Sequence, residues 1–137
     1  AEIVDDYAHH PTEVAATLAA ARPVYPRRAI HAIFQPHLYS PTRDQAAEFG
    51  RALAAADHVV VTDVYPSREQ PIRGVSGELV ARAAQAVGHA RVDYCPDWRQ
   101  AAAKLGELGE SDVVLTLGAG DVYKLGHELA RTPGEAS

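Results

Sequence analysis

The most chemically active stretch of this sequence is the run Asp5-Asp6-Tyr7-Ala8-His9-His10-Pro11-Thr12-Glu13 near its start. A carboxylate in such a run can bind a ribose diol through two charge-assisted hydrogen bonds. A neutral imidazole can bind a metal ion, a phosphate or a carboxylate substrate. The alternative is a solvated turn whose aspartate and histidine side chains only cap the helix that begins at Pro11. Taken alone, the run is compatible with both interpretations.

A second polar turn, Gln35 to Arg43, carries two side chains that can contact an anion, His37 and Arg43. The N–H groups of the helix expected to follow would add a favourable dipole for that anion. The simpler interpretation is ordinary capping of the same helix by Ser40 or Thr42.

A third polar turn, Gly118-Ala119-Gly120-Asp121, resembles the start of a dinucleotide-binding fingerprint, although the third glycine of that fingerprint is missing from its place. Close packing of a helix on a strand would explain the same glycines. A long polar segment at residues 64–75 is a mobile lid, an interdomain contact or a solvated connection between elements. The solvated connection is the favoured interpretation.

The elements that must position these turns follow from the apolar pattern. Apolar runs bounded by polar residues predict buried strands at residues 29–34, 58–63 and 113–117, with weaker strands at 3–4 and 91–94. Helical spacing predicts helices between the strands. This alternation predicts an α/β fold, a three-layer Rossmann-like domain with a mainly parallel sheet and helices on both faces. Ligands bind such sheets at the carboxyl ends of the strands, so the three polar turns are expected along one edge.

Two of the predicted helices give specific expectations for the core. The third helix is expected to point Leu79, Ala83 and Val87 inward. The fourth helix is expected to run from Trp98 to Leu108 with the tryptophan in the core.

The bulk composition is that of one globular domain of 137 residues. A formal net charge of -5 argues against a general nucleic-acid binder, which needs a basic face. No apolar run approaches the roughly 20 residues of a membrane span, and no signal-peptide pattern opens the chain, so no membrane partner is expected. Cys95 is the only cysteine, which together with the missing signal predicts a cytoplasmic, reducing setting.

The sequence contains no methionine and opens on residues that resemble the middle of a strand, so it is expected to be one domain of a longer protein. That domain is expected to span residues 1–131, and residues 132–137, rich in Pro, Gly and Ser, are expected to be disordered. The spacing H-E-x-x-H and a Cys/His quartet are both absent, so no metal site is expected.

In combination the motifs become much more specific. Four motifs follow one another along the chain: D-D-Y-A-H-H-P-T-E, Q-P-H-L-Y-S with T-R-D, V-Y-P-S-R-E-Q-P-I-R-G-V-S-G and L-G-A-G-D-V. They closely resemble the C-terminal domain of the Mur ligase family, over residues 2 to 131 or so. Within the family, the branch resembled adds L-alanine to UDP-N-acetylmuramate in bacterial peptidoglycan synthesis.

The resemblance implies a three-domain enzyme that activates a carboxylate with ATP as an acyl phosphate, which the alanine amine then attacks. An N-terminal domain would bind the UDP-sugar, and a central P-loop domain would bind ATP and Mg²⁺. The present sequence has no G-x-x-x-x-G-K-[ST] motif, so this domain alone is expected to be inactive and to require no cofactor.

The resemblance also implies roles for particular residues. Asp6 would bind the ATP ribose, and Tyr7 would lie along the nucleotide and amino-acid site. His9 would be the catalytic residue that faces the reacting phosphate and the incoming alanine. His37 would lie in the second substrate-facing turn.

The amino-acid contact departs from the family pattern. Many members carry arginine at the positions of Leu38 and Pro41, where it helps to hold the alanine carboxylate. Neither Leu38 nor Pro41 can do so, which leaves Arg43 as the nearest cation for substrate binding.

Two alternatives remain at this stage. The first is the related ligase that recycles murein tripeptide, which typically has phenylalanine at the position of Tyr7. The second is a stand-alone nucleotide-binding regulatory module, which would use Asp6 and the turn Gly118 to Asp121 as a complete site.

Overall fold

The computed structural model describes residues 1–131, so the tail expected to be disordered, residues 132–137, lies outside the described residues. The strands are β1 (Glu2–Asp6), β2 (Ala29–Phe34), β3 (His58–Val61), β4 (Val92–Tyr94) and β5 (Asp112–Leu117). The helices are α1 (Pro11–Val24), α2 (Tyr39–Leu53), α3 (Glu78–Ala86), α4 (Ala102–Leu105) and α5 (Tyr123–Arg131), with a short 3-10 turn at Trp98–Gln100.

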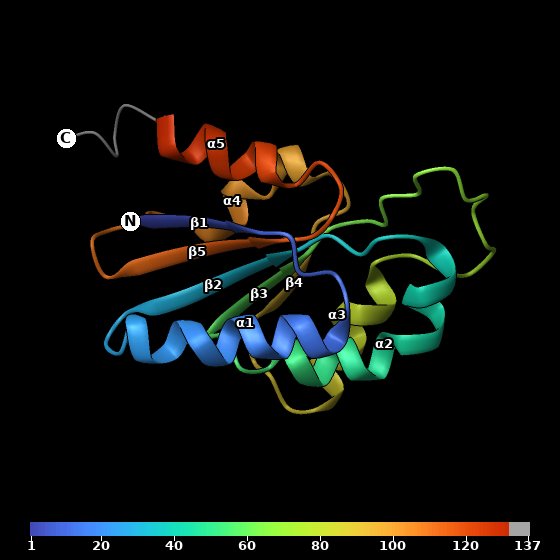
Figure 1. Cartoon of the computed structure of the whole chain (residues 1–137), viewed down its shortest axis with the longest axis horizontal. Coiled ribbons are helices and arrows are strands. Elements are labelled where there is room, and N and C mark those ends of the chain that lie inside the picture. Colours follow the sequence, from blue (N-terminus) through green and yellow to red (C-terminus); the bar gives the residue numbers. More distant parts are fainter. Residues whose placement is uncertain (132–137) are drawn as a thin grey trace.

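The strands form one five-stranded sheet in the order β1-β5-β2-β3-β4. Every pairing is parallel, which confirms the predicted α/β class. The last strand of the chain, β5, lies between β1 and β2 (Figure 1). In the register, Asp6 and Phe34 both pair with Leu117, so β1, β5 and β2 end side by side. The polar turns that follow them therefore leave from one edge, as the sequence predicted.

Helices cover both faces of the sheet, α1, α2 and α3 on one side and α4 and α5 on the other (Figure 1). The larger core lies under α1 to α3 and includes Phe34 and Phe49, whose ring centroids are 4.8 Å apart. The smaller core lies under α4 and α5 and includes Leu105 and Leu125. None of the helices in residues 1–131 combines the length and the apolar character needed to cross a membrane.

The inward face of α3 differs from the predicted one. Val80, Ala81 and Ala84 are buried, whereas Val87 is 49% exposed. Gly77, at the N-cap of α3, packs against the residues that directly follow β3, and a Cβ on Gly77 would lie 1.9 Å from the Thr62 carbonyl oxygen. This close contact fixes the rotation of the helix, so its buried stripe is displaced by one residue from the predicted stripe.

The predicted helix from Trp98 to Leu108 is interrupted. A 3-10 turn at Trp98–Gln100 is followed by the single helical turn of α4, which ends at Gly106 with φ +71°. Trp98 is partly buried against the smaller core. Glycine adopts positive φ without the steric cost that other residues incur, which explains why the helix ends at that position.

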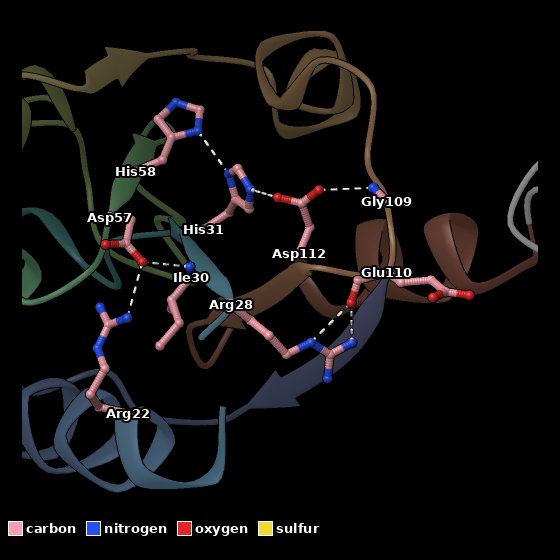
Figure 2. A network of polar contacts seen from close by, with 9 residues as sticks. All are labelled: Arg22, Arg28, Ile30, His31, Asp57, His58, Gly109, Glu110 and Asp112. Atoms are coloured by element: carbon pink, nitrogen blue, oxygen red, sulfur yellow. Dashed lines mark hydrogen bonds and ion pairs between the residues drawn. The ribbon is translucent and has the colours of Figure 1, made fainter. Parts of the chain in front are cut away.

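A buried polar row crosses the sheet at its amino end, on the α4 and α5 side. The two imidazoles of His31 (β2) and His58 (β3) meet with their Nδ1 atoms 3.0 Å apart (Figure 2). The Nε2 atom of His31 lies 2.8 Å from Asp112 Oδ1, and that of His58 lies 2.8 Å from Asp93 Oδ2. His31 and His58 are 3% and 2% exposed. We call these four residues the histidine row.

Candidate ligand-binding edge of the sheet

Four aromatic rings line up along the carboxyl edge of the sheet. The ring centroids of Tyr7 and His9 are 5.8 Å apart and those of His9 and His37 are 5.7 Å apart, both edge to face. His37 stacks on Tyr65 at 6.0 Å with an interplanar angle of 17°. This ring row, Tyr7-His9-His37-Tyr65, joins the turns that follow β1, β2 and β3. Three of its members were candidates from the sequence, and Tyr65 was not.

Asp6 sits at the start of this edge, and its carboxylate is held by the turn it begins. Oδ1 accepts a hydrogen bond from the Ala8 N–H at 2.8 Å, and Oδ2 accepts one from Thr17 Oγ1 at 3.3 Å. Each oxygen keeps a lone pair for a further donor. The adjacent Tyr7 is 71% exposed, an unusual position for a large aromatic ring. An oriented carboxylate beside an exposed ring fits a ribose and the nucleotide base attached to it.

The neighbouring Asp5 is committed to the fold. Its Oδ1 accepts a hydrogen bond from Thr116 Oγ1 at 2.5 Å, and its Oδ2 lies 3.3 Å from His127 Nε2. A Cβ on Gly126 would lie 2.1 Å from Asp5 Oδ1, so α5 packs directly on this carboxylate. The two adjacent aspartates thus differ, because Asp5 is bonded within the fold whereas Asp6 lies on the turn at the sheet edge.

Glu13 closes the turn that carries His9 and His10. Its Oε1 accepts hydrogen bonds from the His9 N–H at 3.2 Å and the His10 N–H at 3.1 Å, and these bonds lower the pKa of the Glu13 carboxyl. The His9 Nδ1 lies 3.0 Å from the Tyr7 carbonyl oxygen, to which only an N–H can donate. In the neutral ring, this leaves His9 Nε2 with a lone pair. Glu13 therefore caps the helix, and the same turn presents the His9 imidazole with its Nε2 atom available.

His37 is held by ring contacts and by the backbone. No hydrogen bond engages its ring within residues 1–131. Its backbone forms a parallel bridge with Tyr65 just beyond the sheet. Burial, reinforced by the charges of His9 and His10, lowers the pKa of His37 below its usual value. The ring is therefore neutral at pH 7.

The amino end of α2 differs from the expected capping pattern. The helix begins at Tyr39, one residue before Ser40, and the N-cap position is Leu38 with φ +68°. The helix is capped instead by Glu69, from the long segment at residues 64–75. The Glu69 carboxylate accepts hydrogen bonds from the Tyr39 N–H, from the Ser40 N–H at 3.1 Å and from Ser40 Oγ at 2.6 Å. The anion position predicted at this helix end is thus filled by a carboxylate of the chain itself.

Arg43 does not join the ring row. Its Nε donates to Asp44 Oδ1 at 2.8 Å, and its side chain is 51% exposed. The carboxylate of Asp44 raises the pKa of Arg43, so the guanidinium is positively charged at neutral pH.

One cluster at this edge could hold a metal ion. Ligand atoms of His9, His10 and Glu13 all lie within 4.8 Å of one another. Magnesium prefers oxygen ligands, and imidazole suits zinc, copper or nickel instead. The residues present therefore do not fit Mg²⁺, and the expectation that the domain has no metal site stays a prediction.

Sequence reasoning missed Tyr65, Glu69 and Gln35. Gln35 is buried, donates from Nε2 to Asp121 Oδ1 at 2.7 Å and accepts from the Val122 N–H at 3.1 Å. These three side chains act between turns that are far apart in the sequence, so no local spacing marks them. Only the position of Tyr65, directly after a buried strand, was a usable signal.

The parallel sheet and its polar carboxyl edge define a Rossmann-like, ligand-facing α/β domain. The family described as "Mur ligase, glutamate ligase domain" matches residues 1–120. The chain belongs to the Mur ligase family.

Among similar proteins is the UDP-N-acetylmuramate–L-alanine ligase of Mycolicibacterium vanbaalenii, 54% identical over 132 residues, which are 93% of this chain and 27% of the relative. The crystal structure of the UDP-N-acetylmuramate–alanine ligase of Thermotoga maritima superposes with a TM-score of 0.77 at 28% identity, over 98% of this chain and 27% of that one. The chain thus spans about a quarter of the length of the relatives it matches.

A third similar structure shows the fold by itself. It is a domain from a putative UDP-N-acetylmuramate:L-alanyl-γ-D-glutamyl-meso-diaminopimelate ligase of Haemophilus ducreyi. It superposes with a TM-score of 0.66 at 22% identity, over 93% of this chain and 86% of that one. A domain of this fold has therefore been crystallised without the rest of its enzyme.

Proposed function

We propose that this chain is the C-terminal domain of an ATP-dependent ligase that joins L-alanine to UDP-N-acetylmuramate in peptidoglycan synthesis. Two similarities support the proposal: membership of the Mur ligase family and about 50% identity to ligases of that name. The domain would close the active site over ATP and alanine. The UDP-sugar would bind to an N-terminal domain, and the phosphates and Mg²⁺ to a central domain, in a cytoplasmic enzyme.

The observation that carries the proposal is the neighbourhood of Asp6, Tyr7, His9 and His37 along one sheet edge. A carboxylate and an exposed ring suit the ribose and base of ATP. Two imidazoles beside them suit the reacting end of the nucleotide and the incoming amino acid. The arrangement makes half of a site, because it offers no phosphate-binding loop of its own.

The imidazoles have different tasks in this proposal. Alanine reacts through its neutral amine, so a proton must leave its ammonium group. His9 Nε2 carries the lone pair that accepts this proton, because Nδ1–H is committed to the Tyr7 carbonyl oxygen. His37, kept neutral by burial and by its histidine neighbours, contacts the substrate without adding charge. Arg43 would hold the alanine carboxylate.

The test is alanine-dependent phosphate release by the full-length ligase. Asp6→Asn keeps an acceptor for the Ala8 N–H but removes the charge, so KM for ATP should rise on the order of 10-fold. His9→Ala should lower kcat on the order of 100-fold. His127→Ala, on the exposed side of α5, is the matched control. Unchanged kinetics in both test variants would refute these roles.

The same assay separates the related recycling activity. Murein tripeptide should not replace alanine as a substrate if the proposal is correct. The stand-alone nucleotide-binding module is tested by calorimetry of this chain with ATP. Because this chain has no phosphate-binding loop of its own, weak binding is expected, and sub-millimolar affinity would favour the module.

A further inference from the structure

The glycine turn between β5 and α5 packs against two side chains of other turns. A Cβ on Gly120 would lie 2.5 Å from Gln35 Oε1 and 2.5 Å from Tyr65 Cγ. Gly118 has φ +153°, and its Cβ would lie 3.0 Å from the Gln35 carbonyl oxygen. The glycines that resembled a dinucleotide fingerprint are thus explained by close packing of protein groups.

Tyr65 is fixed from several directions at once. Its N–H donates to the Pro36 carbonyl oxygen at 2.8 Å, and its own carbonyl oxygen accepts from the Leu38 N–H at 2.9 Å. One part of its ring rests on Gly120, which leaves no room for a side chain there. Backbone pairing sets the position of the residue, and contact with Gly120 restricts the orientation of the ring.

His37 depends on this ring for its own position. Tyr65 stacks on His37, while His9 meets His37 edge to face. Since no hydrogen bond engages the His37 ring within residues 1–131, these ring contacts are what orients it. Burial is the first cause of the lowered pKa of His37, the charges of His9 and His10 add to it, and the charge of Glu69 opposes it.

We propose that Tyr65, seated on Gly120, is a positioning residue that holds His37 against His9 in the ligand-binding edge. Tyr65 acts through His37 and need not touch a reactant. The role of Gly120 in this turn is then to leave room for the Tyr65 ring, which a side chain at that position would displace. The expected effect of Tyr65 on catalysis rests on the proposed function, whereas its effect on the position of His37 does not.

The direct test is an NMR titration of the His37 ring in this chain. Tyr65→Leu removes the flat ring, so His37 becomes more exposed and its pKa should rise. Tyr65→Phe keeps the stack and should leave that pKa unchanged. Tyr123→Leu, which changes an exposed tyrosine of α5, is the matched control and should also leave it unchanged. An unchanged His37 pKa in folded Tyr65→Leu protein would overturn the proposal.

Gly120→Ala provides a second route that keeps every ring of the row. The added methyl group would lie 2.5 Å from Tyr65 Cγ as well as 2.5 Å from Gln35 Oε1, so the Tyr65 ring must shift and the His37 pKa should move in the same direction as in Tyr65→Leu. If Tyr65→Leu fails to fold, the His37 pKa of Gly120→Ala tests the proposal in its place. A folded Gly120→Ala protein with the wild-type His37 pKa would again overturn the proposal.

Kinetics of the full-length ligase separate this inference from the proposed function. Tyr65→Leu should raise KM for alanine or lower kcat on the order of 10-fold, with Tyr65→Phe restoring most of the loss. The pH at which the acid limb of kcat/KM falls should move in the direction of the His37 pKa. A shifted His37 pKa with unchanged kinetics would refute the proposed role of His37 while supporting that of Tyr65.

Discussion

Two groups of histidines occupy opposite ends of the same sheet. At the amino end, His31 and His58 are buried and meet through their Nδ1 atoms (Figure 2). The Nε2 atom of each ring lies 2.8 Å from an aspartate oxygen, so both nitrogens of each ring are bonded. At the carboxyl edge, His9 and His37 are only partly buried. There His37 makes no ring hydrogen bond among the described residues, and His9 keeps Nε2. The same side chain is a structural link in one group and an available base in the other.

The difference lies in what each ring nitrogen must do. A hydrogen bond between two Nδ1 atoms needs a proton on one and a lone pair on the other, so at most three protons fit on the four nitrogens of His31 and His58. A fourth would bring two N–H groups face to face. Burial, with the charges of Arg91 and His31, correspondingly lowers the pKa of His58, although Asp93 opposes this. The two imidazoles of the histidine row can therefore carry at most three ring protons, whereas no hydrogen bond between imidazoles sets such a limit in the ring row.

The largest expected effect is on stability. His31→Leu leaves His58 and Asp112 without their buried partner, so the free energy of unfolding should fall by about 2–4 kcal/mol. His37→Leu removes no ring hydrogen bond and should change it by less than about 0.5 kcal/mol. Urea denaturation of this chain measures both. Equal losses in the two variants would remove the distinction between the groups.

The next effect is a loss of stability in acid. The folded-state pKa of His58 lies below its unfolded value, so the unfolded chain binds more protons below about pH 6.5. Stability should therefore fall as the pH is lowered from 7 to 5, with a slope of up to about 1.4 kcal/mol per pH unit for one imidazole. The lowered pKa of His37 acts in the same direction.

A His37→Gln variant isolates the contribution of the histidine row, because it removes the contribution of the ring row. This variant should keep a clear loss of stability between pH 7 and pH 5. A flat profile would mean that His58 takes up its proton freely in the folded chain.

Chemical modification offers a comparison on a smaller scale. Diethyl pyrocarbonate attacks unprotonated imidazole nitrogens, and mass spectrometry locates the product. His9 and His37 should react at least about tenfold faster than His31 and His58, since the buried pair reacts only when the sheet opens locally. Comparable rates would show that the amino end opens readily, contrary to the burial described.

The smallest expected effect is within the ring row. The charge of His10 contributes to the lowered pKa of His37, so His10→Gln should raise that pKa. An NMR titration of this chain measures the shift, and His127→Gln, on α5, is the control. A fall in the His37 pKa would contradict the assigned cause.

Much of the architecture could be predicted from the sequence because it rests on local patterns. The runs at residues 29–34, 58–63 and 113–117 gave three strands at nearly the observed positions. The edge shared by the polar turns followed from parallel pairing. The face of α3 did not follow, because it depends on the contact of Gly77 with Thr62 across the fold.

The candidate site was predictable only in part. Asp6, Tyr7, His9 and His37 came from motifs, and the structure brings the last three into one row. The contribution of Tyr65 depends on strand order, since β3 must lie beside β2 before the two turns can meet. The histidine row was hidden for the same reason. His31 interrupts an apolar run and His58 begins one, and nothing in either run identifies the partner.

The place of β5 has a consequence for synthesis on the ribosome. Within the described residues, β1 pairs only with β5, so the strand that leads to Asp6 and Tyr7 lacks a partner until residue 117 has left the ribosome. Pairing across such a long separation is slow, and it leaves an early strand edge exposed. A nascent chain that stops short of β5 can therefore form helices, but it cannot assemble the edge that would receive a nucleotide.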